Sequence, residues 1–195
     1  MPAYDFIPSW HDTGACMDKR HIAWLYELLV RMRPERTLEI GGYTGCSSAA
    51  FVAAGVPDVH FAEISPNEKF LSIVRGNGTL HQRKGCDVIR EQAAFELILL
   101  DGAHDLESVR EEWDAMQDRL PRVLVLHDTW SKDAGFPHCE GPSWLMDQMI
   151  GPEWHSFSDM RYREGEMTHR GLTMLTREDM LRDVILAAKV VSDCL

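Results

Sequence analysis

The fold is decided by residues 37–45, Thr37-Leu38-Glu39-Ile40-Gly41-Gly42-Tyr43-Thr44-Gly45. The first four residues predict a short strand, and residues 47–54 predict a helix directly after the turn. Gly41 and Gly45 permit a tight turn and let a ligand approach the backbone closely. The spacing differs from the G-x-G-x-x-G dinucleotide fingerprint, and Glu39 before the first glycine favours a positively charged ligand over a diphosphate.

Further short apolar runs follow at intervals, separated by helical patterns. They predict strands at 59–62, 95–100 and 122–126, with a weaker one near 79–84. The runs 95–100 and 122–126 are nearly continuous in apolar residues, as expected of strands covered on both faces. Alternating strands and helices predict an α/β fold, with a mostly parallel sheet between two layers of helices.

The two ends of the chain predict helical segments. Residues 18–32 form the first helix, with Asp18 placed to cap it, and strands at 154–163 and 171–176 predict a hairpin. A last helix from about residue 177 has Thr176 and Asp179 spaced as a capping box. Its apolar face could cover the sheet or make a homodimer contact. We expect one domain over 1–195, with a helical segment at 1–34 and the last helix at 177–195.

Polar side chains end each of the four main runs. Glu39 precedes the glycine turn, Glu63 ends the second run, Asp101 and His104 follow the third, and His127-Asp128 ends the fourth. Parallel strands deliver their carboxyl ends to one edge of the sheet, where ligands bind at the change in strand order. We therefore expect these groups to build one site, in which Glu63 can accept hydrogen bonds from ribose hydroxyls.

Composition limits the partners. The 195 residues carry a formal net charge of −11, and no apolar run approaches a bilayer span. Such a charge opposes binding to phosphate backbones and anionic lipid, so we expect a small-molecule substrate, no nucleic acid and no membrane. Five widely spaced cysteines and a start without a signal-peptide pattern predict reduced thiols and a cytoplasmic protein.

The segments 38–45, Glu63 and 99–104 together resemble the class I S-adenosylmethionine (SAM)-dependent methyltransferases. More narrowly, the chain is similar to small-molecule O-methyltransferases of the caffeoyl-CoA, catechol, macrocin and cephalosporin-hydroxylase-associated type, over roughly residues 17–176. The resemblance implies a doubly wound, Rossmann-like sheet of seven strands, with one antiparallel strand in the C-terminal hairpin.

The resemblance also implies roles for individual residues. The turn 39–45 would hold the methionine part of SAM, Glu63 its ribose, and Gly85-Cys86-Asp87 its adenine. The implied cofactor-binding residues are Glu39, Gly41, Gly42, Tyr43, Thr44, Gly45, Ser47, Glu63, Ile64, Asp87 and Asp101.

A metal site and a base are implied as well. Asp101, Asp128 and His127 would hold Mg²⁺ or a similar divalent cation. Asp101 and His104 are the implied catalytic residues, with His104 taking the proton of the acceptor hydroxyl. The sequence His127-Asp128-Thr129 departs from the Asp-Asn-Thr of catechol-type relatives. Two alternatives stay open, an NAD-dependent oxidoreductase and a non-catalytic cofactor-binding accessory protein.

Overall fold

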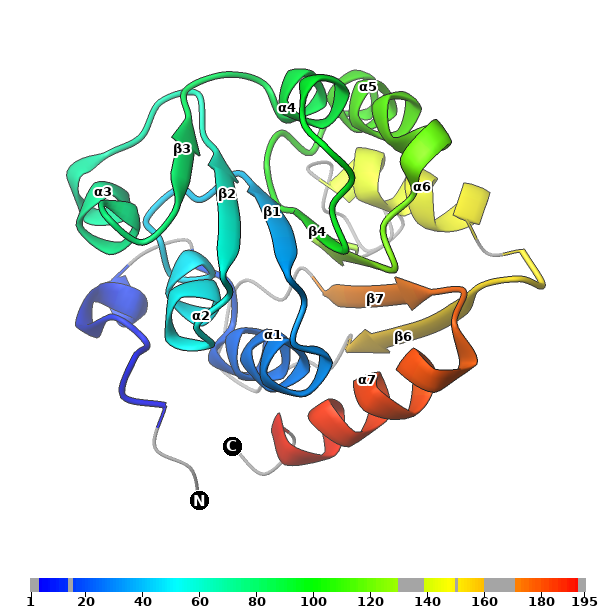
Figure 1. Ribbon diagram of the computed structural model, residues 1–195, viewed down its shortest axis with the longest axis horizontal. Helices are drawn as coiled ribbons and strands as arrows, with labels where there is room; N and C mark the ends of the chain where they lie inside the picture. Colours follow the sequence, from blue (N-terminus) through cyan, green and yellow to red (C-terminus); the bar gives the residue numbers. More distant parts are fainter. Residues whose placement is uncertain (1–3, 14–15, 130–138, 150, 160–170, 193–195) are drawn as a thin grey trace.

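The computed structural model describes residues 4–13, 16–129, 139–149, 151–159 and 171–192. A seven-stranded sheet in the order β3-β2-β1-β4-β5-β7-β6 forms its centre (Figure 1). The strands are β1 (Arg36–Ile40), β2 (Asp58–Ala62), β3 (Thr79–His81), β4 (Leu97–Leu100), β5 (Val123–His127), β6 (His155–Asp159) and β7 (Leu172–Thr176).

Strands β1 to β5 pair in parallel, and β7 pairs antiparallel with both β5 and β6. This confirms the predicted mostly parallel sheet with one antiparallel strand. The connection between the two strands of the expected hairpin lies outside the described residues.

Helices cover both faces of the sheet. They are α1 (Lys19–Met32), α2 (Ser48–Ala53), α3 (Glu68–Val74), α4 (Gly85–Glu91), α5 (Leu106–Met116), α6 (Glu140–Met149) and α7 (Asp179–Ser192), with 3-10 turns η1 (Ser9–Thr13) and η2 (Gln117–Arg119). Figure 1 shows α1, α2 and α7 on one face and α4, α5 and α6 on the other.

The central strands divide their side chains between two cores with a period of two. In β4, Leu97 and Leu99 pack in the core beneath α1, α2 and α7. Ile98 and Leu100 pack in the opposite core, beneath α4, α5 and α6. This alternation fixes which face of the sheet each strand residue reaches.

The ends of the first and last helices differ in how well the sequence predicts them. Asp18 caps α1 as expected, because its carboxylate accepts a hydrogen bond from the Arg20 amide at 2.8 Å. The capping box at Thr176 is wrong, since α7 begins at Asp179. The Thr176 hydroxyl instead donates to the Arg122 carbonyl and accepts from the Glu178 amide, which ties the end of β7 to the start of β5.

The apolar face of α7 covers the sheet. Leu181, Ile185 and Ala188 are buried in the core that α7 shares with α1. The Trp24 indole of α1 donates to the Ile185 carbonyl at 3.2 Å. Among the described helices, none has the length and apolar character of a membrane span.

Candidate active site

A cavity of about 270 Å³ opens at the carboxyl ends of β1, β2 and β4. Strand β1 lies between β2 and β4, so the chain reverses its direction of progress across the sheet here. Ligands of open α/β sheets bind at such a switch point. The cavity extends from the turn after β1 to the first residues of α4 and to one side of α5.

Two glycines let the elements around the cavity approach closely. At Gly41, φ is +85°, and a Cβ atom would overlap the carbonyl oxygen of Asp101. The turns after β1 and β4 are therefore in backbone contact. At Gly85, a Cβ atom would overlap the Ile40 side chain, so the start of α4 also packs directly against β1.

Glu63 is held rigidly at the mouth of the cavity. One carboxylate oxygen accepts from the Tyr43 amide at 3.1 Å and the other from the Ser65 amide at 2.9 Å. Tyr43 has a φ of +43°, and its carbonyl accepts from the Asn67 side chain at 2.6 Å. The Glu63 carboxylate thus links the turn after β1 to the loop after β2.

Glu39 lies beneath the turn and does not line the cavity. Its carboxyl group is fully buried and accepts hydrogen bonds from the hydroxyls of Ser47 and Ser48 at the start of α2. Burial raises the pKa of Glu39 to about 8, against the opposing effect of the two serine hydrogen bonds. The group therefore fixes the start of α2 relative to β1.

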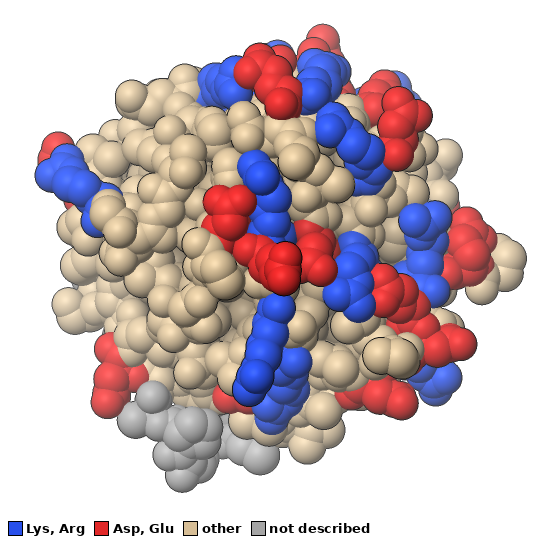
Figure 2. Space-filling model, in the orientation of Figure 1, with Lys and Arg blue, Asp and Glu red and all other residues tan. Residues whose placement is uncertain are grey.

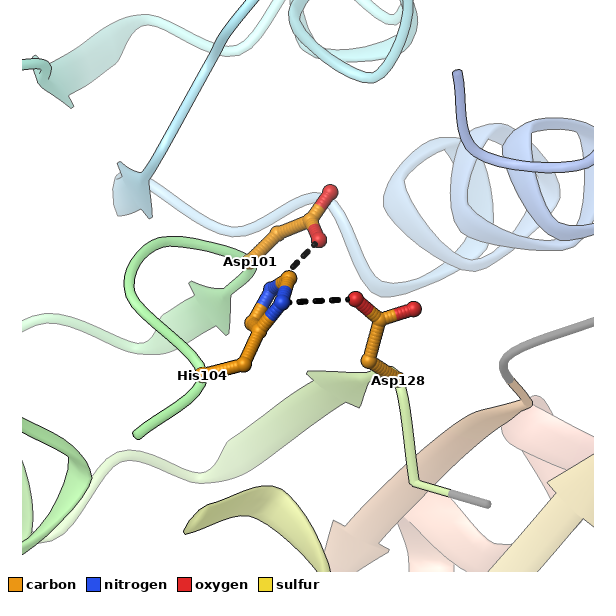
Figure 3. Close-up of side chains that lie close together, drawn as sticks. All are labelled: Asp101, His104 and Asp128. Atoms are coloured by element: carbon orange, nitrogen blue, oxygen red, sulfur yellow. Dashed lines mark ion pairs between the residues drawn. The ribbon is translucent and has the colours of Figure 1, made fainter. Parts of the chain in front are cut away.

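Three side chains converge beside the cavity at the ends of β4 and β5. His104 lies between Asp101 and Asp128 (Figure 3). Its Nδ1 is 2.8 Å from an Asp128 oxygen, and its Nε2 is 3.6 Å from an Asp101 oxygen. One ligand atom from each of the three lies within 4.8 Å of the others, as a metal site requires. Asp128 is fully buried with a φ of +57°, a left-handed conformation that aspartate tolerates.

His127 contacts both carboxylates of this cluster. Its Nδ1 is 2.8 Å from an Asp101 oxygen and 3.3 Å from an Asp128 oxygen. The ring also packs edge-on against buried His21 of α1, with centroids 5.8 Å apart. His104 thus joins Asp101 and Asp128 in the converging set, and His127 supports it.

The two carboxylates stabilise the protonated form of His104. Burial disfavours the charged form of His104, but its ion pairs with Asp101 and Asp128 outweigh burial and raise its pKa to about 10. Burial also opposes ionisation of Asp101, yet His127 and His104 hold the pKa of Asp101 below its ordinary value. With this charge distribution, His104 is a proton donor at neutral pH.

Solved structures share this architecture. An O-methyltransferase from Bacillus cereus, in complex with S-adenosylhomocysteine (SAH), is 14% identical, with 90% of this chain and 91% of that chain covered and a TM-score of 0.65. One from Streptomyces achromogenes, involved in tomaymycin synthesis and in complex with SAM, is 17% identical, with 90% and 99% covered and a TM-score of 0.58. An rRNA methylase from Streptococcus thermophilus is 14% identical, with 83% and 98% covered and a TM-score of 0.56.

The chain has the class I methyltransferase fold. No family model and no curated protein matches its sequence.

Within the methyltransferase fold, the predicted cofactor residues fall into two groups. Gly41, Tyr43, Glu63, Ile64 and Asp101 line the cavity. The others lie outside its lining: Glu39, Gly42, Thr44, Gly45, Ser47 and Asp87. A Cβ at Gly42 would overlap the Phe70 ring, so that glycine serves packing against α3. Asp87 is turned to the surface, 3.5 Å from Arg90.

Glu112 is a site residue that the sequence reading missed. It lines the cavity from α5 and is only 6% exposed. Burial raises its pKa to about 8, with the His104 charge opposing. The sequence did contain a sign of this position. At helical spacing, Glu112 falls on the same face as the apolar residues Val109, Trp113 and Met116. A charged residue at that position was overlooked.

Proposed function

We propose that the chain is a SAM-dependent methyltransferase that transfers the methyl group to a hydroxyl of a small molecule. The observation that carries the proposal is the cavity at the switch point, which holds Gly41, Glu63 and Asp101 on the three adjoining strand ends. The solved O-methyltransferases of the same fold, bound to SAH or SAM, support the choice of cofactor.

Different parts of the cavity lining suit the ribose, the adenine and the methionine part of this cofactor. Glu63 presents oxygen atoms to the two ribose hydroxyls, in a geometry already fixed by the amides of Tyr43 and Ser65. Adenine would lie toward Gly85, Cys86 and Glu112, where the neutral carboxyl group of Glu112 can hydrogen-bond a heterocycle edge. The methionine part would lie along the turn after β1, near Gly41 and Asp101.

Methyl transfer is an in-line displacement, so the protein must align the acceptor oxygen with the sulfonium methyl group and remove the hydroxyl proton. His104 can take that proton only in its neutral form. The charges of Asp101 and Asp128 raise the pKa of His104 to about 10. His104 can therefore become neutral near pH 7 only if another positive charge balances these two carboxylates.

The residues of the cluster fit a divalent cation. Asp101, His104 and Asp128 offer two carboxylates and one imidazole, and His104 Nε2 is buried without a hydrogen-bond partner among the described residues. A bound Mg²⁺ or Mn²⁺ would compensate the carboxylates and lower the pKa of the acceptor hydroxyl. Asp101 and Asp128 would be its ligands, and His104 would stay beside the ion, where the weakened pull of the two carboxylates would leave it free to act as the base.

A small acceptor is favoured over a nucleic acid. On the face shown in Figure 2, basic side chains lie among acidic ones, and the net charge of −11 opposes a polyanion. The rRNA methylase of the same fold makes nucleic acid the alternative acceptor to test.

Calorimetric titration with SAM, SAH and NADH tests the cofactor. We expect saturable heat with SAM and SAH only, and a loss of at least roughly tenfold in affinity for Glu63→Ala, which removes charge-assisted hydrogen bonds to the ribose. The matched control is Glu68→Ala on α3, outside the cavity lining. Binding of NADH instead of SAM would reject the proposal.

Turnover tests the remaining steps. With SAM bound, Asp128→Asn should abolish Mg²⁺- or Mn²⁺-dependent methyl transfer to a panel of phenolic and aliphatic alcohols, while SAM affinity stays within about threefold. Full activity in excess chelator would exclude the metal. SAM binding without turnover on hydroxyl compounds or RNA would favour the accessory-protein alternative.

A further inference from the structure

The segment that precedes α1 contacts the turn after β1. The Trp10 indole donates to the Thr44 carbonyl at 3.2 Å. The Cys16 sulfur is 3.1 Å from the Thr44 hydroxyl oxygen. Residues before the first helix therefore rest on the turn that borders the cavity.

Two free thiols meet at this contact. The Sγ atoms of Cys16 and Cys46 are 3.0 Å apart, although the residues are 30 positions apart in sequence. The Thr44 hydroxyl lies beside both, 3.5 Å from Cys46 Sγ. A disulfide bond needs a sulfur separation of about 2.05 Å, so joining the two requires an approach of roughly 1 Å.

The surroundings divide the roles of the two sulfurs. Cys16 is half-buried, whereas Cys46 is 3% exposed. The hydrogen bond from Cys46 lowers the pKa of Cys16 to about 6, against burial and with help from Thr44, His11 and Lys69. The hydrogen bond to Cys16, together with burial, raises the pKa of Cys46. Cys16 is thus the accessible thiolate, and Cys46 is its buried partner.

We propose that Cys16 and Cys46 form a thiol–disulfide exchange site, at which oxidation joins the segment before α1 to the turn after β1. Nothing in this step depends on the proposed methyl transfer. Any effect of the cross-link on SAM binding does rest on that function. Such an effect would arise because Cys46 follows the turn that borders the cavity.

The oxidant is a small-molecule disulfide such as oxidised glutathione. The Cys16 thiolate attacks one of its sulfurs, the S–S bond breaks and one glutathione thiolate leaves. Cys46 then loses its proton to solvent and attacks Cys16 Sγ, which forms the Cys16–Cys46 bond and expels the second glutathione thiolate. Two protein thiols are oxidised by two electrons, and one disulfide is reduced to two thiols.

The test is a titration of the full chain with oxidised glutathione, followed by alkylation, trypsin digestion and mass spectrometry. We expect a cross-linked pair of tryptic fragments, 1–19 and 37–69, that dithiothreitol separates. The cross-linked form should melt roughly 5 °C higher, because the bond closes a loop of about 30 residues in the unfolded chain.

Variants assign the cross-link. Cys16→Ser and Cys46→Ser should each abolish it, and Cys46→Ser should stop the reaction at the mixed disulfide between Cys16 and glutathione. Cys86→Ser is the matched control and should leave it unchanged, since the Cys86 thiol faces the carboxylates of Asp87 and Glu111. Cys16→Ser alters a half-buried residue, so it keeps the test open if Cys46→Ser fails to fold.

Two results would overturn the proposal: both thiols stay alkylatable in excess oxidised glutathione, or Cys46 pairs with a cysteine other than Cys16. SAM titration of the reduced and oxidised forms separates this proposal from the proposed function. A cross-link in a chain that never binds SAM supports the exchange site and rejects the methyltransferase. SAM binding in a chain that never cross-links does the reverse.

Discussion

Individual carboxyl groups around the cavity differ in charge because their surroundings differ. Glu39 and Glu112 are buried with raised pKa values, whereas the pKa of Asp101 is lowered by two imidazoles. A neutral carboxyl group can both donate and accept a hydrogen bond, and an ionised one only accepts. The cavity thus offers a neutral group, Glu112, at its α5 side and a charged group, Asp101, at the end of β4, while the neutral Glu39 lies buried beneath the turn.

Glu112→Gln should change stability in a pH-dependent way. The pKa of Glu112 is about 8 in the folded chain against an ordinary 4.5, so the folded state holds its proton more tightly. Stability of the natural chain therefore falls as pH rises from 4.5 to 8, and glutamine removes that loss. Urea unfolding should show near-equal stability at pH 5 and a variant more stable by about 3 kcal/mol at pH 8.5.

Glu111→Gln is the control for this measurement. The adjacent Glu111 is hydrogen-bonded to Lys84 at 2.9 Å, and this bond lowers its pKa. Its replacement should give no gain at high pH. If both variants gave the same pH profile, burial of Glu112 would not be the cause.

At the scale of elements, the cavity depends on two turns in backbone contact. Gly41→Ala would place a methyl group against the Asp101 carbonyl and keep a left-handed φ of +85°. We expect a loss of stability above roughly 3 kcal/mol and of SAM affinity above tenfold, because the turns after β1 and β4 must separate. Urea unfolding and calorimetry measure both.

Gly55→Ala separates conformation from contact. Gly55 also has a positive φ, +68°, but a Cβ there meets nothing within 4 Å. We expect a loss of about 1 kcal/mol and unchanged SAM affinity. Equal effects of the two substitutions would show that backbone strain, and not the contact between turns, governs the site.

At the scale of the whole molecule, a bound cofactor would connect the carboxyl ends of β1, β2 and β4 to α4 and α5. A ligand that binds only the folded state at 100 times its Kd adds about 2.7 kcal/mol of stability. For a chain of this size, that corresponds to a rise in Tm of roughly 5 to 10 °C. Thermal melts with SAM should show this rise and melts with NADH none; a flat response to SAM would contradict the proposed function.

The fold was largely predictable because the central strands are buried on both faces and read as continuous apolar runs. The edge strand of the sheet was less predictable. β3 covers only Thr79–His81 of the expected 79–84, because it has a partner strand on one side alone. The start of α7 was predicted too early. The Thr176 hydroxyl does not cap the helix but donates to the carbonyl of Arg122 at the start of β5, which lies 54 positions away in the sequence.

The site was predictable in position but not in the direction of each side chain. In β1, Leu38 and Ile40 face α4 and α5, so the period of two turns Glu39 toward α2 and away from the cavity. Asp101 and Asp128 do meet, as four strand ends at one edge suggested. The sequence analysis placed His127 with Asp101 and Asp128, whereas in the structure His104 converges with them. This difference depends on the geometry of the loop after β4, which the pattern of residues does not reveal.

The insertion of β7 between β5 and β6 has a consequence for synthesis on the ribosome. β1 to β5 have all their mutual partners once residue 127 has emerged, whereas β6 has none until β7 follows it. A nascent chain stalled before Leu172 would thus present an open β5 edge beside an unpaired β6. Completion of the sheet therefore waits until Leu172–Thr176 has been translated.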